Sequence, residues 1–303
     1  MKKLWLIPAA LGAAALVLTE EVYRYSFCRE GSRLLAPLLD KRGHEDNYYL
    51  RRDEAADALR RRTRERMEIH SARGEKLVGW YYPLGGEGRR IAFLVHGYRS
   101  EHAETAGLYA DYYASRGFDL FCCDLTAHGD SEGRLIGFDA YEGEDCLRWI
   151  DALTKRFGED VQLILHGFSM GAATVLSISD RCPPQVRFLV EDSGYFSGEE
   201  QLRPSLGVLY PILRLSHRLI AGLDLRQTDV RAALSRARLP ILFVHGKQDP
   251  TVPFSNGETL YRLYAGPKDC LFTENARHIE TMYREPALYA EKLDRMIRDY
   301  VSD

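Results

Sequence analysis

Short apolar runs and helix-length stretches alternate along the chain from about Arg66 onward. The apolar runs are continuous, as in strands buried on both faces of a sheet. After an antiparallel hairpin predicted at 67–71 and 76–82, they lie at 91–95, 118–123, 161–165, 188–190, 241–244 and 270–272. Helix-length stretches lie at 104–115, 138–157, 169–181 and 279–300. This alternation predicts an α/β fold, with a mostly parallel eight-stranded sheet and helices on both faces.

One stretch breaks the alternation. About fifty residues separate the sixth predicted strand from Ile241, which is longer than a crossover connection needs. Apolar residues recur there at helical spacing, at Leu202, Leu206, Leu209, Leu213 and Ile220. We expect residues 195–239 to form a helical cap over the strand ends. A helix packed against the edge of the sheet is the alternative.

The N-terminal pattern differs from the rest. Lys2 and Lys3 precede an uncharged run, Leu4–Leu18, which is short for a membrane span and has the length of a signal-peptide core. We expect residues 1–20 to be an uncleaved membrane anchor, with the remainder of the chain outside the cytoplasm. A signal peptide that is cleaved to give a secreted protein is the alternative. Residues 21–65 are predicted to be a charged helical linker, and residues 66–303 to be the folded domain.

Composition narrows the class of protein. With 45% hydrophobic and 28% charged residues, the chain is globular rather than disordered. Lys and Arg (41) nearly balance Asp and Glu (44), so net charge gives no reason to expect a nucleic-acid partner. The six cysteines form no C-x-x-C pair of the kind that binds zinc, so we expect no metal site.

The strongest motif is His166-Gly167-Phe168-Ser169-Met170-Gly171, between a predicted buried strand and a predicted helix. It fits the G-x-S-x-G nucleophile elbow, in which glycines permit a very tight strand-to-helix turn and the serine oxygen is presented at its apex. A phosphate-binding turn or a plain loop is the alternative for such a short pattern. The backbone N–H of Met170 would face a developing oxyanion.

A serine nucleophile needs an imidazole base, and that base needs an acid to orient it. His278 follows the last predicted strand, and Asp249 lies in a Gly turn after the seventh; Asp192, after the sixth, is the second candidate for the acid. The order Ser, Asp, His is the one that such a fold uses. Tyr98, after the third strand, is expected to supply a second oxyanion N–H, and its side chain either brings its hydroxyl into the pocket or packs in the core or a lid.

Together these motifs resemble the α/β-hydrolase superfamily, from about Arg66 to the C-terminus. The resemblance rests on Leu94–Tyr98, Asp124–Gly133, His166–Gly171, His245–Asp249 and Ala276–His278, which occur in the expected order. With the predicted anchor, the chain is most similar to bacterial cell-surface serine hydrolases near the serine-aminopeptidase-like and monoacylglycerol-lipase-like branches. The resemblance implies a triad of Ser169, Asp249 and His278, with oxyanion N–H groups from Tyr98 and Met170.

We therefore expect a membrane-anchored serine hydrolase that cleaves an acyl ester or thioester, including a lipid-like one, through an acyl-serine intermediate. The apolar face of the predicted cap could cover the acyl chain. No cofactor is needed, because the nucleophile, the base and the oxyanion donors all belong to the chain. A peptidase or amidase, an acyltransferase, and a non-catalytic binding module remain alternatives, since the fold alone does not choose among them.

Overall fold

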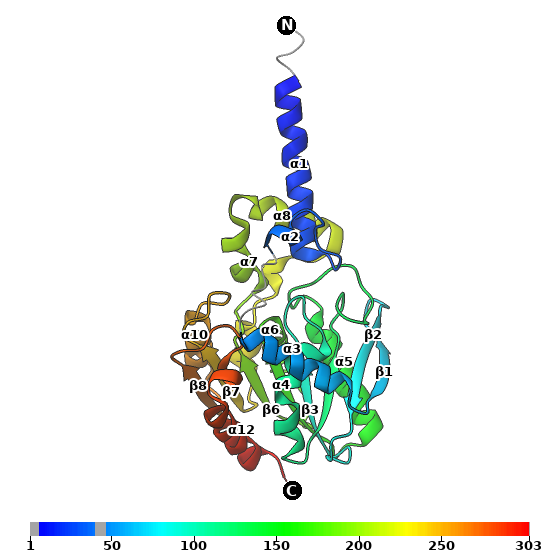
Figure 1. Cartoon of the computed structure of the whole chain (residues 1–303), viewed down its shortest axis with the longest axis vertical. Helices are drawn as coiled ribbons and strands as arrows, with labels where there is room; N and C mark the ends of the chain where they lie inside the picture. Colours follow the sequence, from blue (N-terminus) through cyan, green and yellow to red (C-terminus); the bar gives the residue numbers. More distant parts are fainter. Residues whose placement is uncertain (1–5, 40–46, 303) are drawn as a thin grey trace.

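The computed structural model describes residues 6–39 and 47–302. In these residues, eight strands form one sheet in the order β1-β2-β4-β3-β5-β6-β7-β8 (Figure 1). The strands are β1 (Glu65–His70), β2 (Lys76–Tyr82), β3 (Arg90–Val95), β4 (Asp119–Cys123), β5 (Gln162–Phe168), β6 (Val186–Asp192), β7 (Ile241–Gly246) and β8 (Lys268–Thr273). β2 pairs antiparallel with β1 and β4, and all other neighbours are parallel. The predicted α/β fold with a mostly parallel eight-stranded sheet is confirmed.

The helices follow the predicted alternation. They are α1 (Leu6–Phe27), α2 (Ala36–Leu39), α3 (Asn47–Arg60), α4 (His102–Ala114), α5 (Glu142–Phe157), α6 (Met170–Ser177), α7 (Gly198–Leu206), α8 (Tyr210–Ala221), α9 (Arg231–Arg236), α10 (Ser255–Leu263), α11 (Thr281–Arg284) and α12 (Pro286–Tyr300), with 3-10 turns η1 (Gly207–Leu209) and η2 (Leu225–Gln227). The single helix predicted at the C-terminus is two helices. Pro286 disfavours helical geometry at the preceding residue, and Glu285 has φ −132° and ψ 57°.

The sheet has a hydrophobic core on each face, because successive residues of a buried strand point to opposite sides. Phe93 of β3 faces the side covered by α5 and α6, where it packs in one cluster with the buried Trp149. Its neighbour Leu94 faces the side covered by α4 and α12, in a second cluster with Tyr109 and Tyr289. Both faces are therefore covered, as the continuous apolar runs predict.

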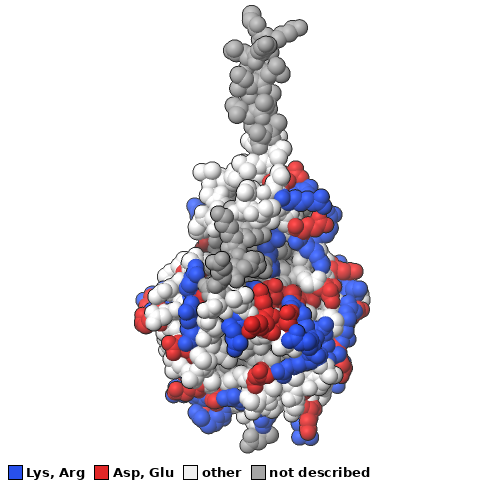
Figure 2. Space-filling view, in the orientation of Figure 1, with Lys and Arg blue, Asp and Glu red and all other residues white. Residues whose placement is uncertain are grey.

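Between β6 and β7 the chain forms α7, η1, α8, η2 and α9. Figure 1 shows α7 and α8 beside the lower part of α1, at the end of the molecule opposite α12. One face of α8 is buried through Leu213 and His217. The other face of α8 exposes apolar side chains, among them Leu219, which is 76% exposed. In the preceding turn η1, Val208 is 94% exposed. In Figure 2 the left side of this end presents uncharged surface and its right side carries charged side chains, whereas the sheet domain carries mixed charges throughout.

Much of the segment predicted to be a linker packs against the domain. Tyr23 and Phe27 of α1 are buried in the same cluster as Trp149. α3 lies along α4 so closely that a Cβ atom on Gly107 would stand 2.5 Å from the backbone of Ala55. Charged side chains of the segment also make contacts: Arg29 donates to the carbonyls of Ser131 and Gly129, and Arg60 pairs with Glu101 (2.6 Å).

The expected membrane anchor has no support in the structure. Within residues 6–39 and 47–302, no helix is long and apolar enough to cross a membrane. The uncharged part of α1 ends at Thr19, and the same helix continues through Glu20, Glu21 and Arg24. A span requires about 20 apolar residues, which this helix lacks. Residues 1–5 of the expected anchor lie outside the described residues.

Candidate active site

Ser169 lies at the tight turn between β5 and α6. Its backbone has φ 53° and ψ −115°, a conformation that residues with side chains rarely adopt. The neighbouring glycines are required sterically. A Cβ atom on Gly167 would stand 2.2 Å from the carbonyl oxygen of Gly171, and one on Gly171 would stand 2.1 Å from that of Val95. The turn thus has the geometry that the G-x-S-x-G pattern predicts.

The structure brings Ser169, His278 and Asp249 into one hydrogen-bonded series. Nε2 of His278 lies 2.9 Å from Oγ of Ser169, and Nδ1 lies 2.6 Å from Oδ2 of Asp249. Asp249 follows β7 and His278 follows β8, two parallel neighbours whose carboxyl ends meet at one edge of the sheet. Ser169 is 8% exposed, so its hydroxyl lies in a largely enclosed site.

The carboxylate of Asp249 is held in its ionised form. Its Oδ1 accepts hydrogen bonds from the backbone N–H groups of Thr251 (2.7 Å) and Val252 (2.9 Å). Burial opposes ionisation, but hydrogen bonds with His245 and His278 outweigh it and keep the pKa of Asp249 well below its usual range. A carboxylate that stays charged can fix the tautomer of His278 and stabilise its protonated form.

Asp192, the second candidate for the acid, faces other groups. Its Oδ2 accepts from the hydroxyls of Tyr289 (2.9 Å) and Tyr109 (3.3 Å), and its Oδ1 accepts from the hydroxyl of Ser193 (2.9 Å). Burial raises the pKa of Asp192, although the hydroxyls of Ser193 and Tyr289 partly offset the effect. The carboxylate of Asp192 therefore links the end of β6 to α4 and α12 through the two tyrosines. The carboxylate of Asp249, in contrast, contacts His278 directly.

The loop after β3 lies against the serine. A Cβ atom on Gly97 would stand 3.2 Å from Cβ of Ser169 and 3.8 Å from its Oγ. His96 fixes this loop, because its Nε2 accepts from the N–H of Leu125 (3.0 Å) while its Nδ1 donates to the carbonyl of Gly97 (2.7 Å). These partners assign the proton to Nδ1. The backbone at Tyr98 is thus held beside the nucleophile, where an oxyanion donor is expected from the sequence.

A second histidine and α1 complete the support of this loop. Nε2 of His128 accepts from the N–H of Arg99 (3.1 Å), and burial lowers the pKa of His128 to about 3, which keeps it neutral. The Tyr98 hydroxyl does not enter the site. It lies 2.9 Å from the carbonyl oxygen of Tyr25 and 3.1 Å from that of Ser26, both at the end of α1. Sequence reasoning missed this contact, since backbone acceptors leave no motif.

One cluster has the composition of a metal site. Glu101, His102 and Asp124 place one ligand atom each within 4.8 Å of one another. However, Nδ1 of His102 already contacts Glu101 (2.8 Å) and Asp124 (3.2 Å). Burial lowers the pKa of His102, but hydrogen bonds and charge from the two carboxylates outweigh it, and the pKa is raised. Nδ1 of the imidazole therefore already occupies the carboxylates that a metal would need, and the cluster fits a structural role.

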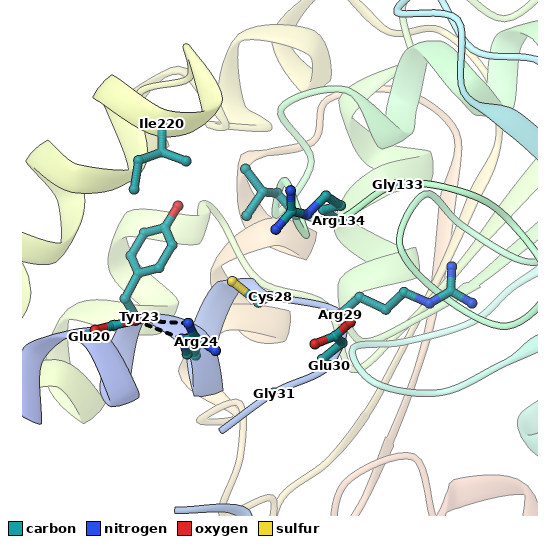
Figure 3. A pocket seen from close by; sticks show the side chains of 11 residues that line it. Glu20, Tyr23, Arg24, Cys28, Arg29, Glu30, Gly31, Gly133, Arg134 and Ile220 are labelled. Carbon is teal, nitrogen blue, oxygen red and sulfur yellow. Dashed lines mark hydrogen bonds and ion pairs between the residues drawn. The ribbon is translucent and has the colours of Figure 1, made fainter. Parts of the chain in front are cut away.

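The described residues also enclose a cavity of about 680 Å³ between the end of α1, residues 133–135 and α8 (Figure 3). Ser169, Asp249 and His278 are not in its lining. Ring contacts connect the two regions: Tyr23 in the lining contacts Phe27, which contacts Phe138, which contacts Tyr98. The cavity is therefore distinct from the serine site but borders the same aromatic group.

Comparison with known proteins agrees with this geometry. The family model described as serine aminopeptidase, S33 matches residues 86–220. The uncharacterized protein YqkD of Bacillus subtilis is 26% identical over 198 residues, which are 62% of this chain and 65% of YqkD. The chain therefore spans just under two thirds of that relative. The uncharacterized protein YfhR of Escherichia coli K12 is 26% identical over 242 residues, 76% of this chain and 78% of YfhR.

The esterase Pf2001 of Pyrococcus furiosus has a similar structure, with a TM-score of 0.65 and 17% sequence identity over 79% of this chain and 92% of the esterase. At that identity the likeness concerns the fold. With the sheet order, the serine turn and the matched family model, it shows that the chain has the α/β-hydrolase fold.

Proposed function

We propose that this protein is a serine hydrolase that cleaves an acyl ester or thioester through an acyl-serine intermediate. The observation that carries the proposal is the position of His278, within hydrogen-bond distance of both Ser169 and Asp249. A nucleophile, a base and an acid in this series form the arrangement that activates a serine hydroxyl.

The proposed reaction has two steps. As Oγ of Ser169 bonds to the acyl carbon, Nε2 of His278 takes the hydroxyl proton and then gives it to the departing alcohol or thiol. A water molecule, deprotonated by the same Nε2, then attacks the acyl-serine, which releases the carboxylic acid and restores Ser169. In both steps the N–H groups of Tyr98 and Met170 stabilise the negative oxygen.

The acyl group is proposed to be apolar. The loop beside Ser169 carries Tyr98, whose ring contacts Phe138, and Phe138 in turn contacts the buried Phe27. Aromatic rings favour an alkyl chain, and each buried CH₂ contributes about 0.8 kcal/mol. We expect kcat/KM to rise with acyl length from two to about eight carbons, by up to about fourfold for each CH₂. A decline beyond acetyl would favour a small polar ester.

Labelling with a fluorophosphonate probe tests the nucleophile. Ser169→Ala should abolish labelling and lower kcat by about 10⁴ to 10⁶, because the serine and its base act as a unit. Ser235→Ala, at an exposed serine of α9, is the matched control and should label normally. Labelling of the Ser169 variant would overturn the assignment.

The matched family model gives a reason to test a peptidase as the second candidate. Esters and amides can use the same triad, so the leaving group must be determined with substrates. A panel of p-nitrophenyl esters and aminoacyl anilides with the full chain separates the two. Turnover of anilides at rates equal to or above those of the esters would replace the esterase proposal with a peptidase.

A further inference from the structure

The cavity between α1, residues 133–135 and α8 has apolar walls. Figure 3 shows the Tyr23 ring extending from α1 toward Ile220 of α8, with Cys28 and Arg134 on the other side. Leu135 completes the apolar lining. At about 680 Å³, the cavity lies within the range of 300 to 1,000 Å³ that is typical of small-molecule sites. It can hold an alkyl chain with a headgroup.

Arginines gather at the same place. Arg24, Arg29 and Arg134 line the cavity. Arg29 also lines a smaller hollow of about 270 Å³ that includes Arg99 and His128. Burial lowers the pKa of His128 to about 3, so this histidine adds no charge. The two hollows therefore share Arg29, and the smaller hollow brings the guanidinium of Arg99 near the larger cavity.

Most of this positive charge has no carboxylate partner in the described part of the chain. Arg29 donates to the carbonyls of Ser131 and Gly129, and Arg99 donates to the Tyr98 hydroxyl and to the carbonyls of Tyr25 and Cys28. These oxygens orient the guanidinium groups but do not neutralise them.

Arg134 has no carboxylate within ion-pair distance among the described residues, whereas Arg24 pairs with Glu20. The remaining acid of the lining is Glu30. Four arginines and two glutamates thus surround the two hollows, an excess of positive charge in a chain whose net charge is −3. Among the described residues, Arg99 donates through Nε and Nη2, so its Nη1 keeps donors for a ligand, since a guanidinium has five N–H groups.

We propose that these hollows form a binding site for an amphipathic anion, separate from the serine site. Its alkyl or acyl chain lies between Tyr23, Leu135 and Ile220. Its phosphate or carboxylate meets Arg29, Arg99 and Arg134. Guanidinium groups match the paired oxygens of such headgroups. An uncharged amphiphile would leave these cations unpaired, and a cationic one would be repelled.

Titration calorimetry on the full chain with decyl phosphate as the probe tests this site. Decyl phosphate should bind with one ligand per chain, and inorganic phosphate at least about 100-fold more weakly, because it lacks the chain whose burial favours binding. Decyltrimethylammonium should not bind. Decanoate tests which headgroup the site prefers. If decanoate binds about as tightly as decyl phosphate, the site accepts anions in general, and if it binds much more weakly, the site prefers phosphate. Both results agree with the proposal.

Two variants and two controls locate the ligand. Arg134→Gln removes a partly solvated cation and should weaken the binding of decyl phosphate by about threefold to fivefold. Ile220→Asp places a negative charge in the apolar wall and should weaken this binding further. Arg148→Gln on α5 and Leu263→Asp on α10 make the same changes at exposed positions outside both hollows and should bind normally. Ser169→Ala should also bind normally, so a failure of the proposed hydrolase would not affect this result.

Three results would overturn the proposal. The first is that inorganic phosphate binds as tightly as decyl phosphate. The second is that decyltrimethylammonium binds as tightly as decyl phosphate. The third is that Arg134→Gln and Ile220→Asp both bind decyl phosphate normally. If decyl phosphate protected Ser169 from fluorophosphonate while these two variants bound normally, the ligand would occupy the serine site instead.

Discussion

Replacing Asp249 with Asn exchanges an oxygen for an NH₂ group in the series that joins Asp249, His278 and Ser169. The structure determines which way the new amide points. Oδ1 of Asp249 accepts two backbone N–H groups, from Thr251 and Val252, and only an oxygen can do so. The amide NH₂ must therefore take the place of Oδ2, 2.6 Å from Nδ1 of His278.

An NH₂ group at that position reverses the hydrogen bond. Nδ1 becomes the acceptor, so the proton of a neutral imidazole moves to Nε2, which faces Oγ of Ser169 at 2.9 Å. A protonated Nε2 cannot accept the serine proton, and the base is lost. We expect kcat to fall by about 10⁴, which corresponds to about 5.4 kcal/mol of transition-state stabilisation.

Steady-state hydrolysis of a p-nitrophenyl ester measures this loss, and thermal unfolding shows whether the variant remains folded. Asp192→Asn is the matched control, because its carboxylate contacts tyrosine and serine hydroxyls rather than His278. It should keep kcat within about tenfold, since it does not change the tautomer of His278. Equal losses in the two variants, or a larger loss at Asp192, would refute the reasoning from Asp249.

Three further changes test the surroundings of the site. Tyr98→Phe removes the hydroxyl that contacts the α1 carbonyls and should lower kcat by about tenfold with little change in KM, as expected for partial misplacement of an oxyanion donor; unchanged kinetics would show that α1 does not position the loop. Phe27→Ala, at a fully buried ring, should cost about 3 to 5 kcal/mol in urea unfolding, whereas Leu34→Ala, at a side chain 62% exposed, should cost under about 0.5 kcal/mol; equal costs would contradict the packing of α1. Burial raises the pKa of Asp145 to about 7, so the folded state holds this proton more tightly than the unfolded chain, and the resulting stabilisation is complete below about pH 4 and lost as the pH rises through 7. Between pH 4 and pH 8, the free energy of unfolding of Asp145→Asn should therefore rise by up to about 4 kcal/mol relative to that of the unmodified protein. Parallel curves of unfolding free energy against pH for the two proteins would contradict the raised pKa of Asp145.

The sheet could be predicted because each buried strand is a continuous apolar run, and its connections are helices of ordinary length. The proximity of Ser169, Asp249 and His278 follows from the same pattern. Each residue comes directly after a strand, and parallel strands bring their carboxyl ends to one edge. Local motifs at those ends were therefore sufficient to place three residues that are far apart in the chain.

The role of the N-terminal segment could not be predicted in this way. Tyr23 and Phe27 lie one helical turn apart, which predicts a common helix face but not what that face contacts. Their partner His217 is 194 residues from Tyr23, in a helix that itself interrupts the regular pattern. The carbonyl acceptors of Tyr98 are backbone atoms that any residue could supply. Such contacts become visible only once the tertiary structure is known.

The packing of α1 also has a consequence for synthesis of the chain. α1 is made before the residues that it packs against: the hydrogen-bond partners of its end lie at Tyr98 and Arg99, and the ring that stacks on Phe27 is His217. At about 5 to 20 residues per second, roughly 10 to 40 s separate the emergence of Tyr23 from that of His217. During that interval the aromatic face of α1 has no permanent partner. A helix that leaves the ribosome before its partners must thus wait for them, and its exposed face is a natural contact for a chaperone.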